Sequence, residues 1–490
     1  MLEGALAYRA RIADSVAIEQ SSRSFTFSEL EAASNYVAHR LLEMGIRRGD
    51  RIVTLIRDPL NHVLAFFGTR KVNAILVPIN PRLGRNFLDF VVKDVSPTLV
   101  IDDYMTSVVK SEDIIRPDAR DYSFTYEERL NLDETKEPVM ILYTGGTTGL
   151  PKGAIIPESA ILWNSVITVL SWGLTSKDCT IVSLPLYHTG GWNVLLLPLI
   201  LVGGRAILPE TDKFDPDWTI RTLHDKGCTI YMGVPTMLDA ISRSPLFDNV
   251  DLSNVTFING GGPLPPFVAE KFFRKGYRMF QGYGLTEAGP NNFYISPERY
   301  VKKPKSVGKP LMFVKMRLSD DGELLIRGPH VFQGYWNRPE ESPFTDDGYL
   351  RTGDLFTIDE NGDFYFLDRK KDMIKTGGEN VYSTEVEEAL RQLPYIEDAA
   401  VFGVPDEHWG EMVVAVVVRK NRGLTEDELK NDLKQVLASY KVPKRVVFVR
   451  EIPKTTVGKI SKKELREIYL KDGFRDYLDE ASKAHGDADA

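Results

Sequence analysis

The segment Tyr143-Thr-Gly-Gly-Thr-Thr-Gly-Leu-Pro-Lys-Gly153 decides how this chain is classified, and it directly follows the apolar run Val139–Leu142. Its glycines let the backbone turn tightly and approach a ligand closely. Backbone N–H groups and threonine hydroxyls can then surround an anion, and Lys152 adds a positive charge. We therefore predict a phosphate-binding loop, with a flexible surface loop as the alternative. It is not the Walker form, because Pro151 takes the place of the last glycine and Gly153 follows the lysine.

The composition is that of an ordinary globular protein of more than one domain. At 490 residues the chain exceeds the size of about 250–300 at which one core stops growing. A net charge of −8 gives no basic surface, which argues against nucleic acid as the main partner. The two cysteines, Cys179 and Cys228, stand in apolar surroundings and are predicted to be packing residues. This usage fits a reducing cytoplasm.

Targeting and membrane segments are not expected. The first ten residues lack a basic region followed by an apolar one, so we expect no signal peptide. The most apolar stretch, Val194–Val202, is shorter than the roughly 20 residues that span a bilayer. We expect it to be buried, with no transmembrane segment.

Short apolar runs alternate with amphipathic ones through the first 300 residues. Residues 51–56, 74–79 and 99–101 are typical of buried strands, and residues 27–44 and 61–72 are typical of helices. The first of these helices has Thr26 or Ser28 as its cap. This alternation predicts an α/β fold with mostly parallel sheets.

The pattern changes near residue 315 to short strands and turns, which predicts a small β-rich subdomain. A second unit follows Asp368-Arg-Lys-Lys371. In it we predict a helix over 384–393, strands over 399–404, 412–418 and 445–449, and a helix from the capping box Thr425–Glu428 to about Ser439. The predicted domains are residues 1–370 and an α+β domain of residues 371–490.

Six further motifs follow the glycine-rich loop. They are Leu184-Pro-Leu-Tyr-His-Thr-Gly-Gly-Trp192, Gln281-Gly-Tyr-Gly-Leu-Thr-Glu-Ala-Gly289, Gly322-Glu-Leu-Leu-Ile-Arg-Gly328, Tyr349-Leu-Arg-Thr-Gly-Asp-Leu355, Asp368-Arg-Lys-Lys-Asp-Met-Ile-Lys-Thr-Gly-Gly378 and Pro453-Lys-Thr-Thr-Val-Gly-Lys-Ile460. In this order the series resembles the adenylate-forming enzymes, namely acyl-CoA synthetases, peptide-synthetase adenylation domains and firefly luciferase. The resemblance covers about residues 25–470 and is greatest to fatty acyl-CoA synthetases. It implies a large N-terminal domain, a small mobile C-terminal domain, and ATP, Mg²⁺ and CoA without a prosthetic group.

The chemistry of such an enzyme explains the residues it needs. A carboxylate does not react with a thiol at neutral pH, because its leaving group would be an oxide. ATP converts that oxygen into a phosphate ester, which requires a triphosphate held in line, a magnesium ion and positive charge at the α-phosphate. The expected reaction joins a small-molecule carboxylic acid to CoA, and a fatty acid within lipid metabolism is the expected substrate.

The resemblance assigns the nucleotide site residue by residue. Those implied for the triphosphate are Thr144, Gly145, Gly146, Thr147, Thr148, Gly149, Lys152 and Thr286, and those for adenine are Gly261, Gly262, Pro263, Tyr283 and Gly284. Glu287 is implied as the Mg²⁺ ligand, Asp354 for the ribose hydroxyls and Arg369 in support of the ribose. Without the motifs, a helix cap for Thr286-Glu287 and a core aromatic for Tyr283 would be favoured. Gly145 departs from the family, which usually has serine there.

The catalytic and moving parts are assigned in the same way. Lys459 matches the lysine that bridges the carboxylate and the α-phosphate, and Lys371 matches the hinge about which the small domain turns between half-reactions. Gly377 and Gly378 are implied to face CoA, and His188 lies near the carboxylate. A surface lysine, a simple turn and a structural histidine are the corresponding alternatives. Thr286 and His188 join Lys459 as the expected catalytic residues.

The acyl pocket is predicted from four residues: His188, Trp192, Gly233 and Val234. In long-chain fatty acyl-CoA synthetases a tryptophan at the place of Trp192 gates the acyl tunnel. The neighbouring residues carry no charge that would pair with a charged acyl group, so an apolar fatty or aryl acid is favoured. A stand-alone enzyme that loads a carrier protein, and a silent acyl- or nucleotide-binding protein, stay as alternatives. Whether the chain forms a homodimer stays open.

Overall fold

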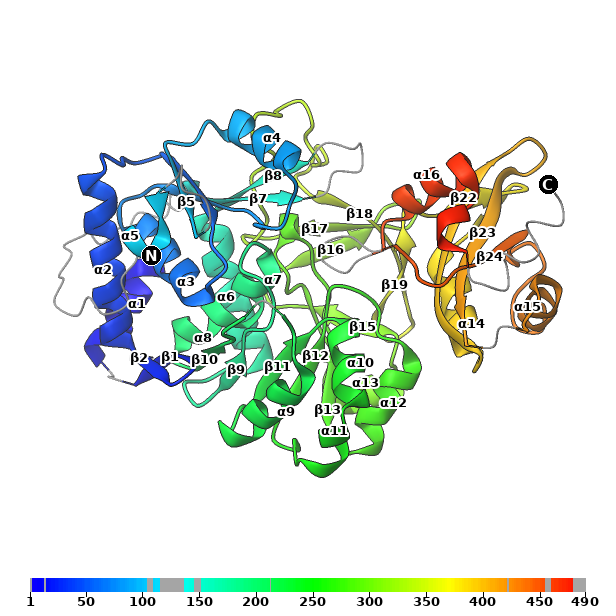
Figure 1. Cartoon of the computed structure of the whole chain (residues 1–490), viewed down its shortest axis with the longest axis horizontal. Helices are drawn as coiled ribbons and strands as arrows, with labels where there is room; N and C mark the ends of the chain where they lie inside the picture. Colours follow the sequence, from blue (N-terminus) through cyan, green and yellow to red (C-terminus); the bar gives the residue numbers. More distant parts are fainter. Residues whose placement is uncertain are drawn as a thin grey trace. The chain divides into compact units, whose positions relative to one another are not determined.

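The computed structural model describes residues 2–12, 15–103, 109–114, 136–144, 151–211, 213–420, 423–453 and 460–478. Two compact units make up the chain (Figure 1). Unit 1 comprises residues 1–317, 325–352 and 360–364, and unit 2 comprises residues 318–324, 353–359 and 365–490. The predicted domain boundary at residue 370 stays a prediction. The observed division also assigns two short segments before that residue to unit 2.

Unit 1 contains three mostly parallel sheets among its described residues. The first has the order β2-β1-β10-β9, with β1 Val16–Gln20, β2 Arg23–Thr26, β9 Cys179–Ile181 and β10 Arg205–Leu208. The second is β11-β12-β13, with β11 Ile230–Gly233, β12 Thr256–Asn259 and β13 Arg278–Gln281. The third is β6-β5-β3-β4-β7-β8, with β3 Arg51–Leu55, β4 Ile75–Pro78, β5 Leu99–Asp102, β6 Val109–Lys110, β7 Pro138–Thr144 and β8 Lys152–Pro157.

Parallel pairing dominates these sheets, as the alternation of apolar runs predicts. The antiparallel exceptions among the described strands are β1 with β2 and β7 with β8. The β-rich part follows, with β14 Phe293–Tyr294, β15 Ser306–Pro310, β16 Lys315–Leu318, β17 Glu323–Arg327, β18 Leu350–Ile358 and β19 Phe364–Arg369. Within β16, β17, β18 and β19 the chain passes between the two units.

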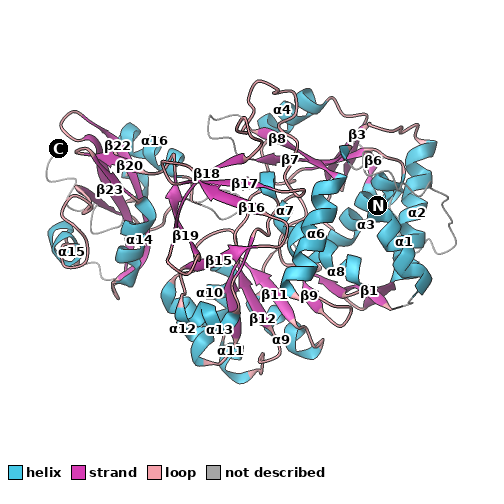
Figure 2. Cartoon of the chain, turned by 180° about the vertical axis from the view of Figure 1, so that it is seen from behind, coloured by secondary structure: helices cyan, strands magenta, loops and turns pink. Residues whose placement is uncertain are grey.

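Helices separate the sheets of unit 1. They are α1 Leu2–Ile12, α2 Phe27–Glu43, α3 Pro59–Lys71, α4 Arg85–Val95, α5 Ser111–Ile114, α6 Glu158–Trp172, α7 Thr189–Gly191, α8 Leu197–Val202, α9 Pro216–Asp225, α10 Pro235–Arg243, α11 Pro245–Asn249, α12 Pro266–Arg274 and α13 Pro297–Lys302. In both views α6 and α8 lie between strands β7 and β8 and the strands β1 and β9 (Figures 1 and 2). This is the layered arrangement expected of an α/β domain.

The start of α2 shows how the sequence sets an element boundary. The Thr26 side chain accepts a hydrogen bond from the Glu29 N–H at 3.2 Å, and the Glu29 carboxylate accepts one from the Thr26 N–H at 3.0 Å. This reciprocal capping box satisfies two backbone donors at the helix start. Of the two predicted caps, Thr26 is therefore the one that the structure uses.

Unit 2 is an α+β domain. Its sheet has the order β21-β20-β23-β22 with β24 beside β23, where β20 is Ile374–Thr376, β21 Glu379–Val381, β22 Ile396–Asp406, β23 Gly410–Arg419 and β24 Arg445–Phe448. Its helices are α14 Ser383–Gln392, α15 Glu426–Leu433 and α16 Lys462–Asp472. Side chains alternate across a strand, so Val401 packs in the cluster with α14 while Phe402 packs in the cluster with α16.

The predicted extent of α15 is wrong. The helix starts after the Thr425 capping box, as expected, but it ends at Leu433 and does not reach Ser439. The next backbone bonds join residues three apart, from Gln435 N–H to Asp432 O and from Val436 N–H to Leu433 O, both at 3.1 Å. Val436 is 62% exposed, so the apolar periodicity that suggested a longer helix has no core to pack against there.

The predicted burial of the apolar stretch and of both cysteines is confirmed. Cys179 and Cys228 are free thiols within the hydrophobic cluster around β11–β13, and their sulfurs lie 3.2 Å apart. The residues from Trp192 to Leu196 form a turn of π-helix, which the sequence did not predict.

Two buried histidines make the stability of unit 1 depend on pH. Burial lowers the pKa of His62 to about 3 and that of His330 to about 4. Both rings stay neutral in the folded state, bonded to the Thr54 hydroxyl at 3.0 Å and to the Asn292 side-chain oxygen at 2.9 Å. The unfolded chain, with ordinary histidine pKa values near 6.5, binds more protons below that pH.

Stability should therefore be complete above about pH 6.5 and fall as the pH drops toward 4. We expect His330 alone to contribute a loss of about 2 kcal/mol in the free energy of unfolding at pH 5 relative to pH 7.5. Urea unfolding of the native chain and of His330→Gln at both pH values measures this. An equal loss in the variant would show that other groups cause the acid sensitivity.

Candidate active site

Three predicted segments meet at the carboxyl edge of the β11-β12-β13 sheet. The register aligns Gly233 with Asn259 and Asn259 with Gln281, the last residues of the three parallel strands. Residues 260–263 and 282–284 leave the sheet at this edge. Open α/β sheets bind ligands outside the carboxyl ends of their strands. The structure thus brings the predicted adenine residues beside the predicted acyl-pocket residues.

Two side-chain amides donate hydrogen bonds to the glycine turn at residues 260–263. The Asn259 amide donates to the Gly262 carbonyl oxygen at 2.7 Å, and the Gln281 amide donates to the same oxygen at 3.3 Å. Gly261 has a φ of +77°, and a Cβ there would lie 3.3 Å from a methyl of Val234. A side chain at residue 261 would therefore strain the backbone, and it would also fill the space between this turn and Val234.

Contacts between its own residues hold the loop that follows β13. This loop carries Tyr283, Gly284, Thr286 and Glu287. A Cβ on Gly284 would overlap the backbone carbonyl of Pro290, so only glycine fits there. The Asn292 side chain donates to the carbonyl oxygens of Ala288 and Gly289 at 3.1 and 2.9 Å. The Tyr283 ring packs edge-on against Phe293, with ring centres 5.6 Å apart.

Thr144 and Lys152 flank the glycine-rich loop. They are directly opposite in the antiparallel pair of β7 and β8, and the Thr144 hydroxyl donates to the Lys152 carbonyl oxygen at 3.4 Å. The two strands that flank the loop in the sequence are therefore paired at its two ends. The predicted residues Gly145, Gly146, Thr147, Thr148 and Gly149 lie outside the described residues.

Lys152 and Glu287 meet around Tyr335, which the sequence motifs do not include. The Tyr335 hydroxyl donates to Glu287 Oε1 at 3.0 Å, and the Lys152 ammonium lies 5.1 Å from the centre of the Tyr335 ring. Lys152 also forms an ion pair with Glu341. Burial and the Glu287 carboxylate raise the pKa of the Tyr335 hydroxyl, so it remains a donor.

Glu287 fits a magnesium ion that arrives with a nucleotide. Among the residues that the structure describes, no group of three or more His, Cys, Asp or Glu side chains could hold a metal ion. Mg²⁺ is commonly bound through one or two carboxylates together with substrate phosphates and waters. A single carboxylate near a lysine that is predicted to bind the triphosphate matches that pattern, and a site built from protein ligands alone is not needed.

His188 and Trp192 stand on either side of the short helix α7. His188 precedes α7, and its ring packs against Tyr187 with centres 4.9 Å apart. Trp192 is fully buried, and its indole N–H donates to the Leu186 carbonyl oxygen at 2.5 Å. Its ring contacts His62 edge-on, with centres 5.7 Å apart. In this arrangement Trp192 is part of the core, and its gating role stays a prediction.

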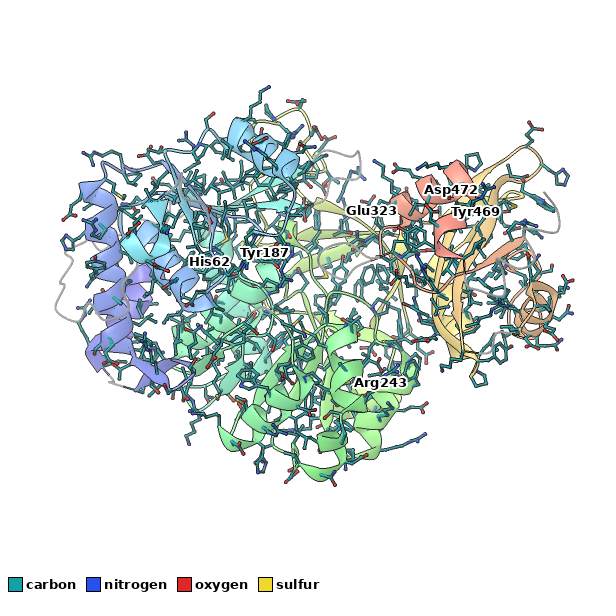
Figure 3. The ribbon with its side chains drawn as sticks, viewed as in Figure 1. His62, Tyr187, Arg243, Glu323, Tyr469 and Asp472 are labelled. Carbon is teal, nitrogen blue, oxygen red and sulfur yellow. The ribbon has the colours of Figure 1, made fainter. Side chains whose placement is uncertain are left out.

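Two hollows flank the segment that leads to His188. A small hollow is lined by Gly190, Gly191, Val194, Leu195, Leu196 and Met232, together with residues 181–184. No ionisable side chain is among these lining residues. A larger hollow lies at the ends of β3, β9 and β10, and its lining includes His62 and Tyr187, both labelled in Figure 3.

In unit 2 the predicted ribose residues are neighbours. Asp354 is 7% exposed, and Arg369 Nε lies 3.6 Å from Asp354 Oδ1. Burial lowers the pKa of the Lys371 ammonium, which follows two residues later at the predicted hinge. Ser383, where the family commonly has proline, donates through its N–H and its hydroxyl to one oxygen of Asp368, at 2.5 and 2.6 Å. Proline has neither donor, so a proline at this position could not make these two contacts with Asp368.

Gly377 and Gly378 form the turn between β20 and β21, with φ of +59° and +85°. A Cβ on Gly377 would lie 3.1 Å from the indole of Trp409, and the Gly377 N–H donates to the Trp409 carbonyl oxygen at 2.8 Å. Trp409 is 38% exposed, with the Lys444 ammonium 4.8 Å from its ring centre. The predicted catalytic Lys459 lies outside the described residues.

Comparison with protein-family models decides the family. Residues 7–336 match the model of AMP-binding enzymes, and residues 385–459 match that of the AMP-binding enzyme C-terminal domain. The chain belongs to the AMP-binding enzyme family. The predicted membership of the adenylate-forming superfamily is thereby confirmed, and the chain is an acyl-CoA synthetase-type ligase.

Known proteins resemble the chain over nearly its whole length. Feruloyl-CoA synthase from Amycolatopsis sp. is 34% identical over 477 residues, covering 94% of this chain and 97% of the relative. The 2-succinylbenzoate–CoA ligase of Bacillus cereus ATCC 14579 is 32% identical over 473 residues, covering 93% and 96%. ATP-bound MatB from Rhodopseudomonas palustris superposes with a TM-score of 0.87 at 31% identity, covering 96% and 99%.

Ligands in related structures agree with the predicted cofactors. O-succinylbenzoate CoA synthetase from Bacillus subtilis, in complex with ATP and a magnesium ion, superposes with a TM-score of 0.84 at 28% identity, covering 94% and 98%. Adenylate-forming CoA ligases use ATP, Mg²⁺ and CoA, as predicted here. No helix in the described ranges is long and apolar enough to cross a membrane. The cytoplasmic location and the homodimer stay predictions.

The contact between Asp354 and Arg369 generates a test of the ribose assignment. A charged hydrogen bond contributes about 1.5–3 kcal/mol. Replacing Asp354 by alanine should therefore raise the KM for ATP more than tenfold, with a smaller effect on the KM for the acid. Steady-state kinetics with ATP as the varied substrate measures this, with the exposed Asp427→Ala on α15 as the control. An unchanged KM for ATP would exclude the ribose role.

Proposed function

We propose that the protein is an acid–CoA ligase for a carboxylic acid with a compact, uncharged apolar body. The acid and ATP would give an acyl-adenylate and pyrophosphate, and CoA would then give the thioester and AMP. The observation that carries this proposal is the hollow around Gly190 and Gly191, whose lining is glycine, apolar side chains and Ser183, with no ionisable side chain among them. A charged tail would lose its hydration there without gaining a partner.

The relatives refine the class of acid. Two of them are named for feruloyl and 2-succinylbenzoyl groups, both aromatic. The second group carries an additional carboxylate, so these names support an aromatic body, whereas the absence of charge rests on the lining of the hollow alone. Trp192, the predicted gate of an acyl tunnel, is fully buried, and a long chain would need this side chain to move, so a compact aromatic or short aliphatic body is the better candidate. The predicted fatty acid is thus one candidate within the wider class of apolar acids.

In the first half-reaction, Lys152, Thr144 and Thr286 would hold the triphosphate, and Glu287 would hold Mg²⁺. The metal ion supplies charge neutralisation at the phosphates. Tyr283 and the glycine turn at residues 260–263 would hold the adenine, while Asp354 and Arg369 would hold the ribose. Lys459 would place positive charge where the carboxylate meets the α-phosphate, the point at which charge develops.

In the second half-reaction, the C-terminal unit would turn at Lys371 and present Gly377 and Gly378 to CoA. The two positive φ values and the closeness of the Trp409 indole mean that a side chain at residue 377 would need the indole to shift. His188 lies at the start of α7, two residues before Gly190 of the apolar hollow, and its ring would turn to clear space for the thiol.

The first experiment measures pyrophosphate release and thioester formation for a panel of acids. The panel holds benzoic and cinnamic acids, straight-chain acids of short, medium and long length, and dicarboxylic acids. We expect turnover that depends on CoA, highest with compact apolar acids and lowest with dicarboxylic acids, because the second carboxylate would be desolvated.

Other outcomes distinguish the alternatives. A single burst of pyrophosphate that CoA does not change would indicate an enzyme that loads a carrier protein. ATP binding without release of pyrophosphate from any acid would indicate a silent binding protein. Preference for long straight chains would confirm the fatty-acid prediction and contradict the compact class.

Substitution of Lys459 should affect the two half-reactions differently. Lys459→Ala should abolish adenylate formation, because the variant lacks the charge between carboxylate and α-phosphate. It should still form thioester from a supplied acyl-adenylate and CoA, because that step does not use the lysine. Pyrophosphate exchange measures the first step and thioester formation the second. Loss of both would show that Lys459 has a different role.

A further inference from the structure

Tyr335 contacts both Lys152 and Glu287. Its hydroxyl donates to Glu287 Oε1 at 3.0 Å, and its ring faces the Lys152 ammonium at 5.1 Å from the ring centre. The two partners come from distant parts of the sequence, β8 and the 3-10 turn Thr286–Ala288. A single ring thus joins the carboxylate assigned to magnesium and the cation assigned to the triphosphate.

The backbone around Tyr335 is fixed on both sides. The Ile155 N–H donates to the Gly334 carbonyl oxygen at 2.9 Å, and the Trp336 N–H donates to the Gly153 carbonyl oxygen at 2.8 Å. Tyr335 itself bridges Ala154 in antiparallel fashion. An isolated antiparallel bridge and the two flanking backbone hydrogen bonds therefore tie this segment to β8 and fix the backbone that carries the tyrosine.

The loop that carries Glu287 is tied to the same segment. The Phe332 N–H donates to the Glu287 carbonyl oxygen at 2.9 Å, and the Phe332 ring packs edge-on against Tyr335 with centres 5.1 Å apart. Backbone and side chain of Glu287 are thus both held from residues 332–335. A ligand that must approach within hydrogen-bonding distance benefits when its binding groups need no rearrangement.

The chemistry of the two contacts suits a metal–triphosphate complex. A carboxylate offers about four lone-pair sites, so a hydrogen bond from Tyr335 to Oε1 is compatible with coordination of a metal ion by the same group. A cation held over an aromatic face keeps its N–H donors for an anion. Tyr335 therefore positions both groups, and it leaves lone pairs on the carboxylate and N–H donors on the ammonium for a ligand.

We propose that Tyr335 is a positioning residue that sets Glu287 and Lys152 in the geometry required for the magnesium–triphosphate complex. The inference rests on the proposed function, because it takes ATP and Mg²⁺ as the ligands. The hydroxyl acts on the metal carboxylate and the ring acts on the lysine. The two parts of the side chain can therefore be removed separately.

The test measures ATP binding by calorimetry in the full-length chain without acid or CoA, so that no turnover occurs. Each variant is titrated with ATP in excess Mg²⁺ and with ATP in EDTA. Tyr335→Phe should weaken binding of the magnesium complex about tenfold and leave metal-free ATP within about twofold, because only the charged hydrogen bond is lost. Tyr335→Leu should weaken both, because the ring under Lys152 is lost as well.

Two further variants keep the test decisive. Tyr277→Phe removes a hydroxyl that donates to the Val250 carbonyl oxygen at 3.2 Å in the core of the same unit, and it should bind both forms of ATP like the native chain. Lys152→Met should weaken the binding of both forms of ATP. Adding Tyr335→Leu to it should weaken the binding of metal-free ATP by no more than about twofold further, because both changes remove the same contact between the ammonium and the ring.

Equal affinity of Tyr335→Phe and the native chain for the magnesium complex would overturn the proposal, as would fully additive losses in the Lys152 pair. Equal weakening of both ATP forms by Tyr335→Phe would show general damage to the fold and would also overturn it. A native chain that makes acyl-CoA while Tyr335→Phe binds normally would leave the proposed function intact. A native chain that binds no ATP would reject both.

Discussion

The parallel pairing of β11, β12 and β13 is the constraint on which the rest of unit 1 depends. Because Gly233, Asn259 and Gln281 are in register, three loops leave the sheet at one edge. The Asn259 and Gln281 amides then donate their hydrogen bonds to the backbone of the glycine turn. These buried amides would be costly without partners. The same bonds that satisfy their N–H groups also shape the surface that faces the predicted nucleotide.

Much of the fold could be predicted from the sequence because local signals and burial agree in it. The apolar run over residues 51–56 became β3, and the Thr26 capping box begins α2 as expected. Where no neighbour buries the apolar face, periodicity misled, as at α15, which stops at Leu433. The π-helical turn that starts at Trp192 has no local signature, since it depends on how buried side chains fit together.

The sequence predicted individual residues of the candidate site better than the contacts between them. Gly284 could be named from its motif, but the reason for a glycine, the Pro290 carbonyl that any side chain there would strike, is a long-range fact of packing. Tyr335 was missed because an aromatic residue after a glycine is common in cores and loops. Only the structure shows its hydroxyl on Glu287 and its ring beside Lys152. Trp409 was missed for the same reason, since its contact with Gly377 depends on strand pairing.

The ion pair between Lys152 and Glu341 indicates how such a site can be charged and still accept a polyanion. Lys152 is only 16% exposed at its side chain, so it requires a counter-charge, whereas Glu341 is 34% exposed and well hydrated. A pair of this kind holds the ammonium with a modest net contribution, because water competes for the exposed carboxylate. A triphosphate carries several charges and more acceptor oxygens, and it would displace one hydrated carboxylate at small cost. The ring of Tyr335 would remain beside the ammonium during this exchange, so the lysine changes its partner without losing its position.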